Sequence, residues 1–206
     1  MYMTRVTLKS VPQPNDMHTL LLAAFGAHND KAQESLWRVD DLGEDKELLI
    51  VSASIPELQQ IVTEIGNGDE SNKTLSYAPF LERIECAQVW NFRLCANPVE
   101  YKKKNASDKR GKICALRSAP EQLAWLDKQS AQNGFDVKDC SVISSEWRIF
   151  KAEKTDKKNA ERILAATFEG VLNVTNADAF RTALVQGVGL GKSHGCGLLT
   201  IAKDNP

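Results

Sequence analysis

The sequence predicts an α+β fold built from two ferredoxin-like units in tandem, each with the element order β-α-β-β-α-β. Strand-like and helical periodicities alternate along all 206 residues, and the order of elements repeats after a turn at Asn97-Pro98. We therefore expect an N-terminal domain at 1–96 and a C-terminal domain at 97–206. The duplication is predicted from element order, because no repeat is visible at residue level.

An amphipathic helix follows the first predicted strand. Apolar and polar residues alternate over 3–9, and two prolines then break the strand. Asn15 or Asp16 is placed to cap the helix, and Gly26 is placed to end it. Its apolar residues recur with helical spacing and form one stripe: Met17, Leu20, Leu21, Ala24 and Phe25.

Short apolar runs between polar or glycine-rich breaks define the rest of the first half. We expect, in order, strands at 36–39 and 47–53 joined by a polar turn at 40–45, a helix opened by Pro56 and stopped at 66–68, a polar loop at 69–76, and a strand at 83–96. These elements complete one β-α-β-β-α-β unit.

The second half repeats this order of elements. We expect, in order, a basic loop at 101–112, a short strand at 113–116, a helix opened at 119–121 and closed by Gly134, strands at 137–149 and 162–174 separated by a polar segment, a helix capped by Asn176 or Asp178, and a last strand at 198–202. A glycine-rich loop joins that last helix to the last strand.

Composition excludes several classes of protein. The hydrophobic content of 42% and the charged content of 26% are ordinary for a globular domain, and no apolar run is long enough to span a membrane. The five cysteines include no C-x-x-C pair, so neither a disulfide framework nor a zinc site is expected. Since the start of the chain lacks the apolar core of a signal peptide, we expect a cytoplasmic location.

Charge is distributed unevenly although the net charge is −1. Residues 1–96 hold 8 Lys and Arg against 14 Asp and Glu, whereas residues 97–206 hold 18 against 13. This asymmetry is typical of a protein with one face that meets a polyanion, and it is also compatible with charges scattered over solvated loops.

Two basic segments are candidates for nucleic-acid contacts. The first contributes Lys102, Lys103, Lys104, Arg110 and Lys112. The second lies between two predicted strands and contributes Arg148, Lys151, Lys154, Lys157 and Lys158. A basic hairpin can enter a nucleic-acid groove, where phosphate contacts dominate affinity. The alternative is a pair of solvated loops.

A glycine-rich segment near the end of the chain is the most unusual stretch. Five of the twelve glycines lie within 187–197, together with Lys192, Ser193 and His194. Glycine permits positive φ and close approach of a ligand to the backbone, so the segment favours an anion cradle that includes Gly189 and Gly191. A tight turn whose glycines serve packing is equally compatible with the spacing.

This segment is not expected to bind a nucleoside triphosphate. Gly191-Lys192-Ser193 supplies the second half of a Walker A motif, but Gln186 stands where its first glycine is needed. The segment also runs from a predicted helix to a predicted strand, the reverse of a P-loop.

The three histidines do not form a metal site. His18, His28 and His194 lie far apart in sequence and lack carboxylates at ligand spacing. Ser193 also lacks the G-x-S-x-G context of a nucleophile elbow. His18 stands out because it lies near the start of a helix, beside its apolar stripe.

Several sequence blocks together resemble the CRISPR-associated endoribonucleases of the CasE type, which process repeat RNA in type I-E systems. The resemblance covers essentially the whole chain. Its blocks include Asp-Met-His-Thr-Leu at 16–20, Phe-Arg-Leu-Cys-Ala-Asn-Pro at 92–98, Glu-Gln-Leu-Ala-Trp-Leu at 121–126, Phe-Glu-Gly-Val-Leu at 168–172 and the glycine-rich block at 187–199. The last block is highly specific, and the block at 92–98 is nearly so.

The resemblance implies two RAMP-type, ferredoxin-like domains and a metal-independent endoribonuclease without a cofactor. Such an enzyme cleaves CRISPR repeat RNA at the base of a hairpin by attack of a 2′-hydroxyl, leaving a 2′,3′-cyclic phosphate and a 5′-hydroxyl. It retains the product inside the Cascade complex, so the implied partners are stem-loop RNA and other Cascade subunits, with neither a membrane nor a nucleotide cofactor.

By the same resemblance, His18 is the catalytic histidine, acting as general base or general acid. Family members often carry a tyrosine three residues before it, where this chain has Asn15. Since an amide cannot donate a phenolic proton, a catalytically silent RNA-binding subunit of the same fold stands as the alternative. Lys192 and backbone N–H groups of the glycine-rich loop would meet the charge that grows on the phosphate.

Overall fold

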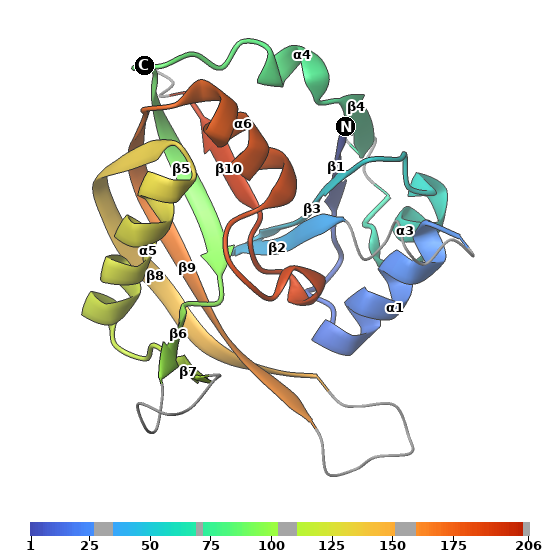
Figure 1. Ribbon diagram of the computed structural model, residues 1–206. Coiled ribbons are helices and arrows are strands. Elements are labelled where there is room, and N and C mark those ends of the chain that lie inside the picture. Colours follow the sequence, from blue (N-terminus) through green and yellow to red (C-terminus); the bar gives the residue numbers. More distant parts are fainter. Residues whose placement is uncertain (27–34, 69–71, 103–110, 151–159, 204–206) are drawn as a thin grey trace.

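The computed structural model describes residues 1–26, 35–68, 72–102, 111–150 and 160–203. Within these ranges two four-stranded antiparallel sheets lie side by side, each covered by helices on one face (Figure 1). The predicted α+β class and the tandem ferredoxin-like organisation are confirmed.

The first sheet has the strand order β2-β3-β1-β4. Its elements are β1 (Tyr2–Thr7), α1 (Pro14–Ala24), β2 (Leu36–Leu42), β3 (Asp45–Ser52), α3 (Leu58–Ile65) and β4 (Lys73–Ser76). The stripe of α1 packs with α3 against the inner face of this sheet, in a cluster that includes Met17, Leu20, Leu21, Ile50 and Ile61. Burial of an apolar stripe is the main force that holds such short helices on a sheet.

The second sheet has the order β10-β5-β9-β8, which places its fourth, first, third and second strands as in the first sheet. A short helix, α4 (Ala78–Leu81), leads into it. Its elements are β5 (Val89–Ala96), α5 (Ala119–Gln132), β8 (Phe135–Phe150), β9 (Glu161–Val174), α6 (Ala177–Gln186), the single turn η1 (Lys192–His194) and β10 (Leu199–Ala202). A hairpin of β6 (Val99–Lys102) and β7 (Lys112–Ala115) is inserted before α5.

The predicted boundary near Asn97 is wrong by one strand. The segment expected to close the first sheet, at 83–96, instead contains β5, which pairs with β9 and β10. The first sheet is closed by β4, inside the stretch predicted as a polar loop at 69–76. β4 is a four-residue edge strand with largely exposed side chains, so it lacks the apolar alternation by which strands are recognised.

Helix starts were predicted with mixed success. Asn15 and Asp16 do not cap α1, because the N-cap is Gln13 and Pro14 occupies the first turn, where its missing N–H costs no hydrogen bond. In α6, Asn176 accepts the N–H of Ala179 at 3.0 Å, as expected. Pro56 lies two residues before α3, whose N-cap is Glu57.

Two predicted loops are in part strands. The turn expected at 40–45 is shorter, because β2 and β3 pair as far as Leu42 and Asp45. The start of the basic loop expected at 101–112 pairs as β6 with β7.

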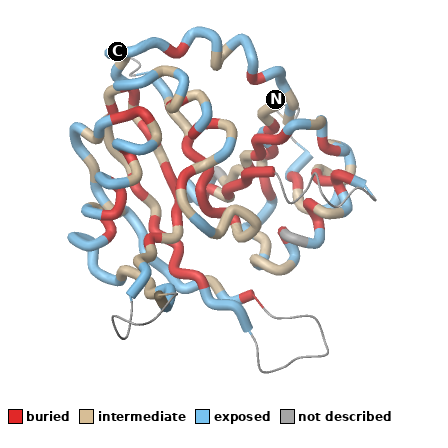
Figure 2. The backbone as a smooth tube through the Cα atoms, in the orientation of Figure 1, coloured by how far each residue is buried: buried red, intermediate tan, exposed pale blue. Residues whose placement is uncertain are grey.

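A buried arginine joins the two halves. Arg38 of β2 is 2% exposed, and all five of its N–H groups are bonded. Nε and one Nη donate to the Asp40 carboxylate at 2.8 Å, and the remaining donors reach the carbonyls of Arg93 and Leu198 and the hydroxyl of Thr200, at 2.7–3.0 Å. The seam between the halves is buried around this group (Figure 2).

Replacing Arg38 is expected to destabilise the whole protein. The Arg38→Ala change leaves the buried Asp40 carboxylate without its main partner and frees three acceptors of the second half. Breaking a buried ion pair in this way costs about 3–5 kcal/mol. The free energy of unfolding in urea measures it.

Arg5→Ala is the matched control. Arg5 also pairs across the first sheet, with Glu47 at 2.5 Å, but its side chain is 47% exposed. Exposed pairs contribute about 1 kcal/mol or less. Equal losses in the two variants would contradict a special role for Arg38.

Candidate active site between the two halves

A groove of about 590 Å³ runs between the start of α1 and the outer edge of β8. The first half contributes Val11, Pro12, Gln13, Pro14, Met17, Trp37, Val39 and Asp41, and the second half contributes Glu146, Trp147, Arg148 and Ile149. The groove therefore exists only because the two halves are docked.

His18 lies on α1 directly after Met17, which is buried and lines the groove. The backbone of α1 at this position is fixed because the apolar stripe of the helix packs on the first sheet. The side chain of His18 lies outside the described part of the structure.

The glycine-rich loop packs against the first half. Its single turn η1 contacts both α1 and β2. The helix that carries His18 and the loop that carries Lys192, Ser193 and His194 are thus neighbours, although more than 170 positions separate them in the sequence.

Packing accounts for two of the loop's glycines. A Cβ on Gly195 would lie 2.8 Å from the ring of Trp37, and a Cβ on Gly189 would lie 2.8 Å from the ring of Trp125. Both residues also have positive φ, +74° and +80°. The sequence left two interpretations open, glycines that serve packing and glycines that form an anion cradle. The close packing is observed here, and the anion cradle stays a prediction.

Part of the loop's backbone remains available to a ligand. The N–H groups of Val188, His194, Gly195, Cys196 and Gly197 are bonded to backbone carbonyls. Among the described residues, no carbonyl accepts from Gly191, Lys192 or Ser193. These three consecutive N–H groups, with the Lys192 ammonium, are the donors that an anion could use.

His194 anchors the loop to the ends of β8 and β9. Its ring accepts or donates a hydrogen bond with Ser193 at 3.0 Å, lies 3.2 Å from the Glu161 carboxylate, and stands edge-on to Phe150 at 4.1 Å between ring centroids. A histidine held on three sides is a positioning group for the loop.

Arg148 faces the interior of the seam. Its side chain is 19% exposed and bonds to Glu146 at 3.2 Å. It also lies close to two buried thiols, Cys95 and Cys196. A hydrogen bond from the Cys196 thiol and the charges of Arg148 and Arg38 lower the pKa of Cys95 below its usual range, whereas the same hydrogen bond and burial raise the pKa of Cys196.

The other predicted cations that the structure describes, Lys102, Lys112 and Lys192, do not line the groove. Lys102 and Lys112 lie on the β6–β7 hairpin, where Lys102 pairs with Glu100 at 2.6 Å. Lys103, Lys104, Arg110, Lys151, Lys154, Lys157 and Lys158 lie outside the described residues.

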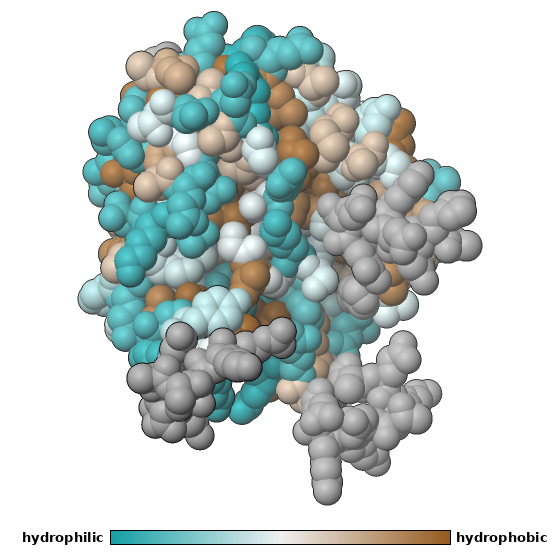
Figure 3. Space-filling model, viewed as in Figure 1, coloured by the Kyte–Doolittle hydropathy of each residue, from teal (hydrophilic) through white to brown (hydrophobic). Residues whose placement is uncertain are grey.

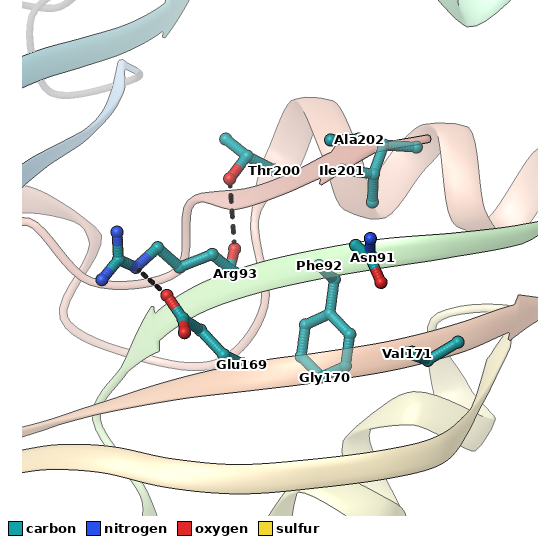
Figure 4. Close-up of a pocket in the computed structure, with 9 residues that line it drawn as sticks. All are labelled: Asn91, Phe92, Arg93, Glu169, Gly170, Val171, Thr200, Ile201 and Ala202. Carbon is teal, nitrogen blue, oxygen red and sulfur yellow. Dashed lines mark hydrogen bonds and ion pairs between the residues drawn. The ribbon is translucent and has the colours of Figure 1, made fainter. Parts of the chain in front are cut away.

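A second hollow, of about 400 Å³, lies on the open face of the second sheet (Figure 4). Its two charged residues, Arg93 and Glu169, pair with each other at 2.8 Å, and Thr200 donates to the carbonyl of Arg93 at 3.3 Å. Since no residue of α1 lines this hollow, we place the candidate site in the groove beside α1.

Two tryptophans that no sequence pattern singled out, Trp37 and Trp147, also line the groove. Trp37 is buried under the glycine-rich loop, and Trp147 is exposed on β8. Neither belongs to a short motif, and only the docking of the halves brings them together.

Within the described ranges, no group of three or more His, Cys, Asp or Glu could hold a metal ion. The described helices also include none that is long and apolar enough to cross a membrane.

Comparisons with known proteins show the family of this chain. A family model described as CRISPR associated protein matches residues 1–203. The chain belongs to this family. Two curated relatives are similar: CRISPR-associated endoribonuclease Cse3 of Thermus thermophilus, 27% identical over 97% of this chain and 94% of its own length, and CRISPR system Cascade subunit CasE of Escherichia coli, 29% identical over 90% of each.

A solved structure of Thermus thermophilus Cse3 bound to an RNA representing a pre-cleavage complex is similar in fold. It matches with a TM-score of 0.75 at 23% identity and covers 98% of both chains. The arrangement of two docked halves is thus shared by this CRISPR-associated chain and by Cse3.

Substituting Gly195 is expected to disturb the contact between the loop and the first half. In Gly195→Ala, the added methyl meets Trp37 at 2.8 Å and the residue must keep φ near +74°. The left-handed conformation alone costs an L-residue about 1–2 kcal/mol, and the steric clash adds to that. Denaturant unfolding gives the free-energy change.

Gly43→Ala separates the two contributions. Gly43 also has positive φ, +88°, but an added Cβ meets nothing within 4 Å. This control should lose only the conformational part. A Gly195→Ala variant no less stable than Gly43→Ala would contradict the packing argument.

Proposed function

We propose that this chain is an endoribonuclease that cleaves CRISPR repeat RNA hairpins and retains the product. The observation that carries the proposal is the packing of η1 against α1 and β2, two elements that line the groove between the halves. The Lys192 loop is thus a neighbour of the helix that carries His18. The names of the two relatives, one an endoribonuclease and one a Cascade subunit, support the same function.

The reaction proposed for this site is transesterification. The ribose 2′-hydroxyl attacks the adjacent phosphorus, and the P–O5′ bond breaks. The products are a 2′,3′-cyclic phosphate and a 5′-hydroxyl, with one proton removed from the 2′-oxygen and one delivered to the 5′-oxygen. Imidazole titrates near neutrality and can perform either proton transfer, which is the role we assign to His18.

Lys192 and the N–H groups of 191–193 are proposed to stabilise the charge that develops on the phosphate. These donors belong to a loop that is fixed by His194 and by close packing on Trp37. Fixed donors aimed at a developing charge stabilise a transition state without reorganising during the reaction. The proposed reaction needs no metal ion.

The long β8–β9 hairpin, here called the β8–β9 ribbon, is proposed to bind the RNA stem. It extends beyond the rest of the second sheet at the lower edge of Figure 1, and Arg148 lies near the end of β8. The basic residues Lys151, Lys154, Lys157 and Lys158 come between the two strands in the sequence and lie outside the described residues. Double-stranded RNA is recognised mainly by shape and by contacts to phosphate and 2′-hydroxyl groups, which suits a basic projection. The β6–β7 hairpin, with Lys102 and Lys112, is proposed to hold flanking nucleotides.

In the cell we place the protein in the cytoplasm, bound to its RNA and to other subunits of a Cascade complex. Retention of the cleaved stem would then anchor the mature RNA in that complex. The DNA of the same sequence should bind at most, because cleavage requires the 2′-hydroxyl.

Cleavage of the host's repeat RNA in excess EDTA is the central test. We expect fragments ending in 2′,3′-cyclic phosphate and 5′-hydroxyl. His18→Ala should lose about 10²- to 10⁴-fold in single-turnover rate while keeping its affinity, because acid–base catalysis contributes about that much. A variant cutting at the wild-type rate would remove His18 from the mechanism.

A 2′-deoxy substitution at the scissile nucleotide is the matched control on the RNA. It should abolish cleavage and preserve binding. The alternative function, a catalytically silent RNA-binding subunit, is favoured by Asn15 in the first turn of α1. It would be established if the wild-type protein bound unmodified RNA and never cut it.

Lys192→Gln is expected to slow cleavage more than it weakens binding. Loss of one preorganised donor to a developing negative charge lowers kcat by about 10²- to 10³-fold. Lys73→Gln, on the exposed edge strand β4 of the first sheet, is the control for general loss of positive charge. Equal effects of both variants on rate would reduce Lys192 to a general phosphate contact.

A further inference from the structure

Trp147 is the exception among the tryptophans of this chain. Trp37, Trp90 and Trp125 are 4%, 7% and 8% exposed, whereas Trp147 is 47% exposed. A largely exposed indole presents a flat apolar surface to solvent, which contributes little to the fold. Its place in the groove suggests a ligand.

The indole is held in a fixed position by its strand. Trp147 pairs with the buried Leu164 in the β8–β9 ladder, and two residues earlier Ser145 accepts a hydrogen bond of 2.9 Å from Gln122 of α5. The guanidinium carbon of Arg117 lies 5.7 Å from the ring centroid, within the range of a cation–π contact. The ring is therefore preorganised, with a positive charge beside it.

We propose that Trp147 is a stacking platform for an unpaired base of the RNA, close to the scissile phosphate. The inference rests on the proposed function and adds a binding residue to it. Trp147 lines the same groove as Met17, the neighbour of His18, so a nucleotide on its ring would have its phosphate near the start of α1. Indole surfaces stack on any base, and Arg117 can pair with the adjoining phosphate.

The composition of the groove fits a nucleotide better than a protein segment. Apolar surface from Val11, Met17 and Ile149 alternates with the charges of Asp41, Glu146 and Arg148. A docking face for a protein has an apolar centre depleted of charge. On the face drawn in the space-filling view, hydrophilic residues cover much of the described surface, and hydrophobic residues appear in patches between them (Figure 3).

The test compares Trp147→Leu with Trp147→Phe in the His18→Ala background, using the host's repeat RNA as the probe. Leucine keeps apolar bulk and removes the ring, whereas phenylalanine keeps a stacking surface. We expect Trp147→Leu to raise Kd about 5- to 100-fold, and Trp147→Phe to recover most of that loss. Ile143→Ala is the matched control, because Ile143 is 46% exposed on the same strand, at a bulge outside the groove.

Abasic substitutions in the RNA identify the stacked base. Each unpaired position is replaced in turn, and the penalty of Trp147→Leu should vanish at one position or two neighbouring ones. Since the other three tryptophans are buried, quenching of indole fluorescence by the intact RNA should also depend on Trp147 and on that base.

Several outcomes would overturn the inference while leaving the proposed function intact. One is an RNA affinity and a cleavage rate that Trp147→Leu leaves unchanged. Another is a loss of RNA affinity in Ile143→Ala equal to that in Trp147→Leu. A third is unchanged RNA affinity with weaker association to other Cascade subunits, which would make the ring a protein contact. Failure of the proposed function looks different, because the wild-type protein would then not cut the repeat RNA, whether or not it bound that RNA.

Discussion

The buried guanidinium of Arg38 is the constraint on which the rest of the structure depends. Removing a cation from water is unfavourable unless every donor is bonded, and here the acceptors come from both halves. Leu198, one of those acceptors, directly follows the glycine-rich loop. The ion therefore fixes the loop's end relative to β2, and the halves cannot slide without exposing an unpaired charge.

The candidate site is a consequence of that fixed seam. Trp37, next to Arg38 on β2, supports Gly195, so the turn η1 is placed against the first half by a ring that a Cβ would displace. His194 holds the other side of the turn on Phe150 and Glu161. The glycine cluster, for which the sequence also allowed an anion cradle, thus serves first to pack the loop against the first half. The same packing fixes the position of the loop N–H groups at 191–193.

The sequence predicted the order of elements and the chemistry of individual residues better than it predicted pairing. The stripe of α1 and the cap at Asn176 are local features, readable from spacing and residue type. The strand β5 was assigned to the wrong sheet, because its buried apolar run fits either one, and its competitor β4 is short and polar. Arg38, Trp37 and Trp147 carry no local signal, since their roles depend on contacts across the seam.

Alternation along β8 explains how one ribbon can serve both the fold and the RNA. Beyond the bulge at Val142 to Ser144, Arg148 and Phe150 share one face of β8, where Arg148 lies near the thiols and Phe150 supports His194. Trp147 and Ile149 alternate with them along the strand and stand exposed at the rim of the groove. A one-residue slip would exchange these two sets and unseat the glycine-rich loop. The face offered to RNA is therefore specified by the same register that anchors the loop.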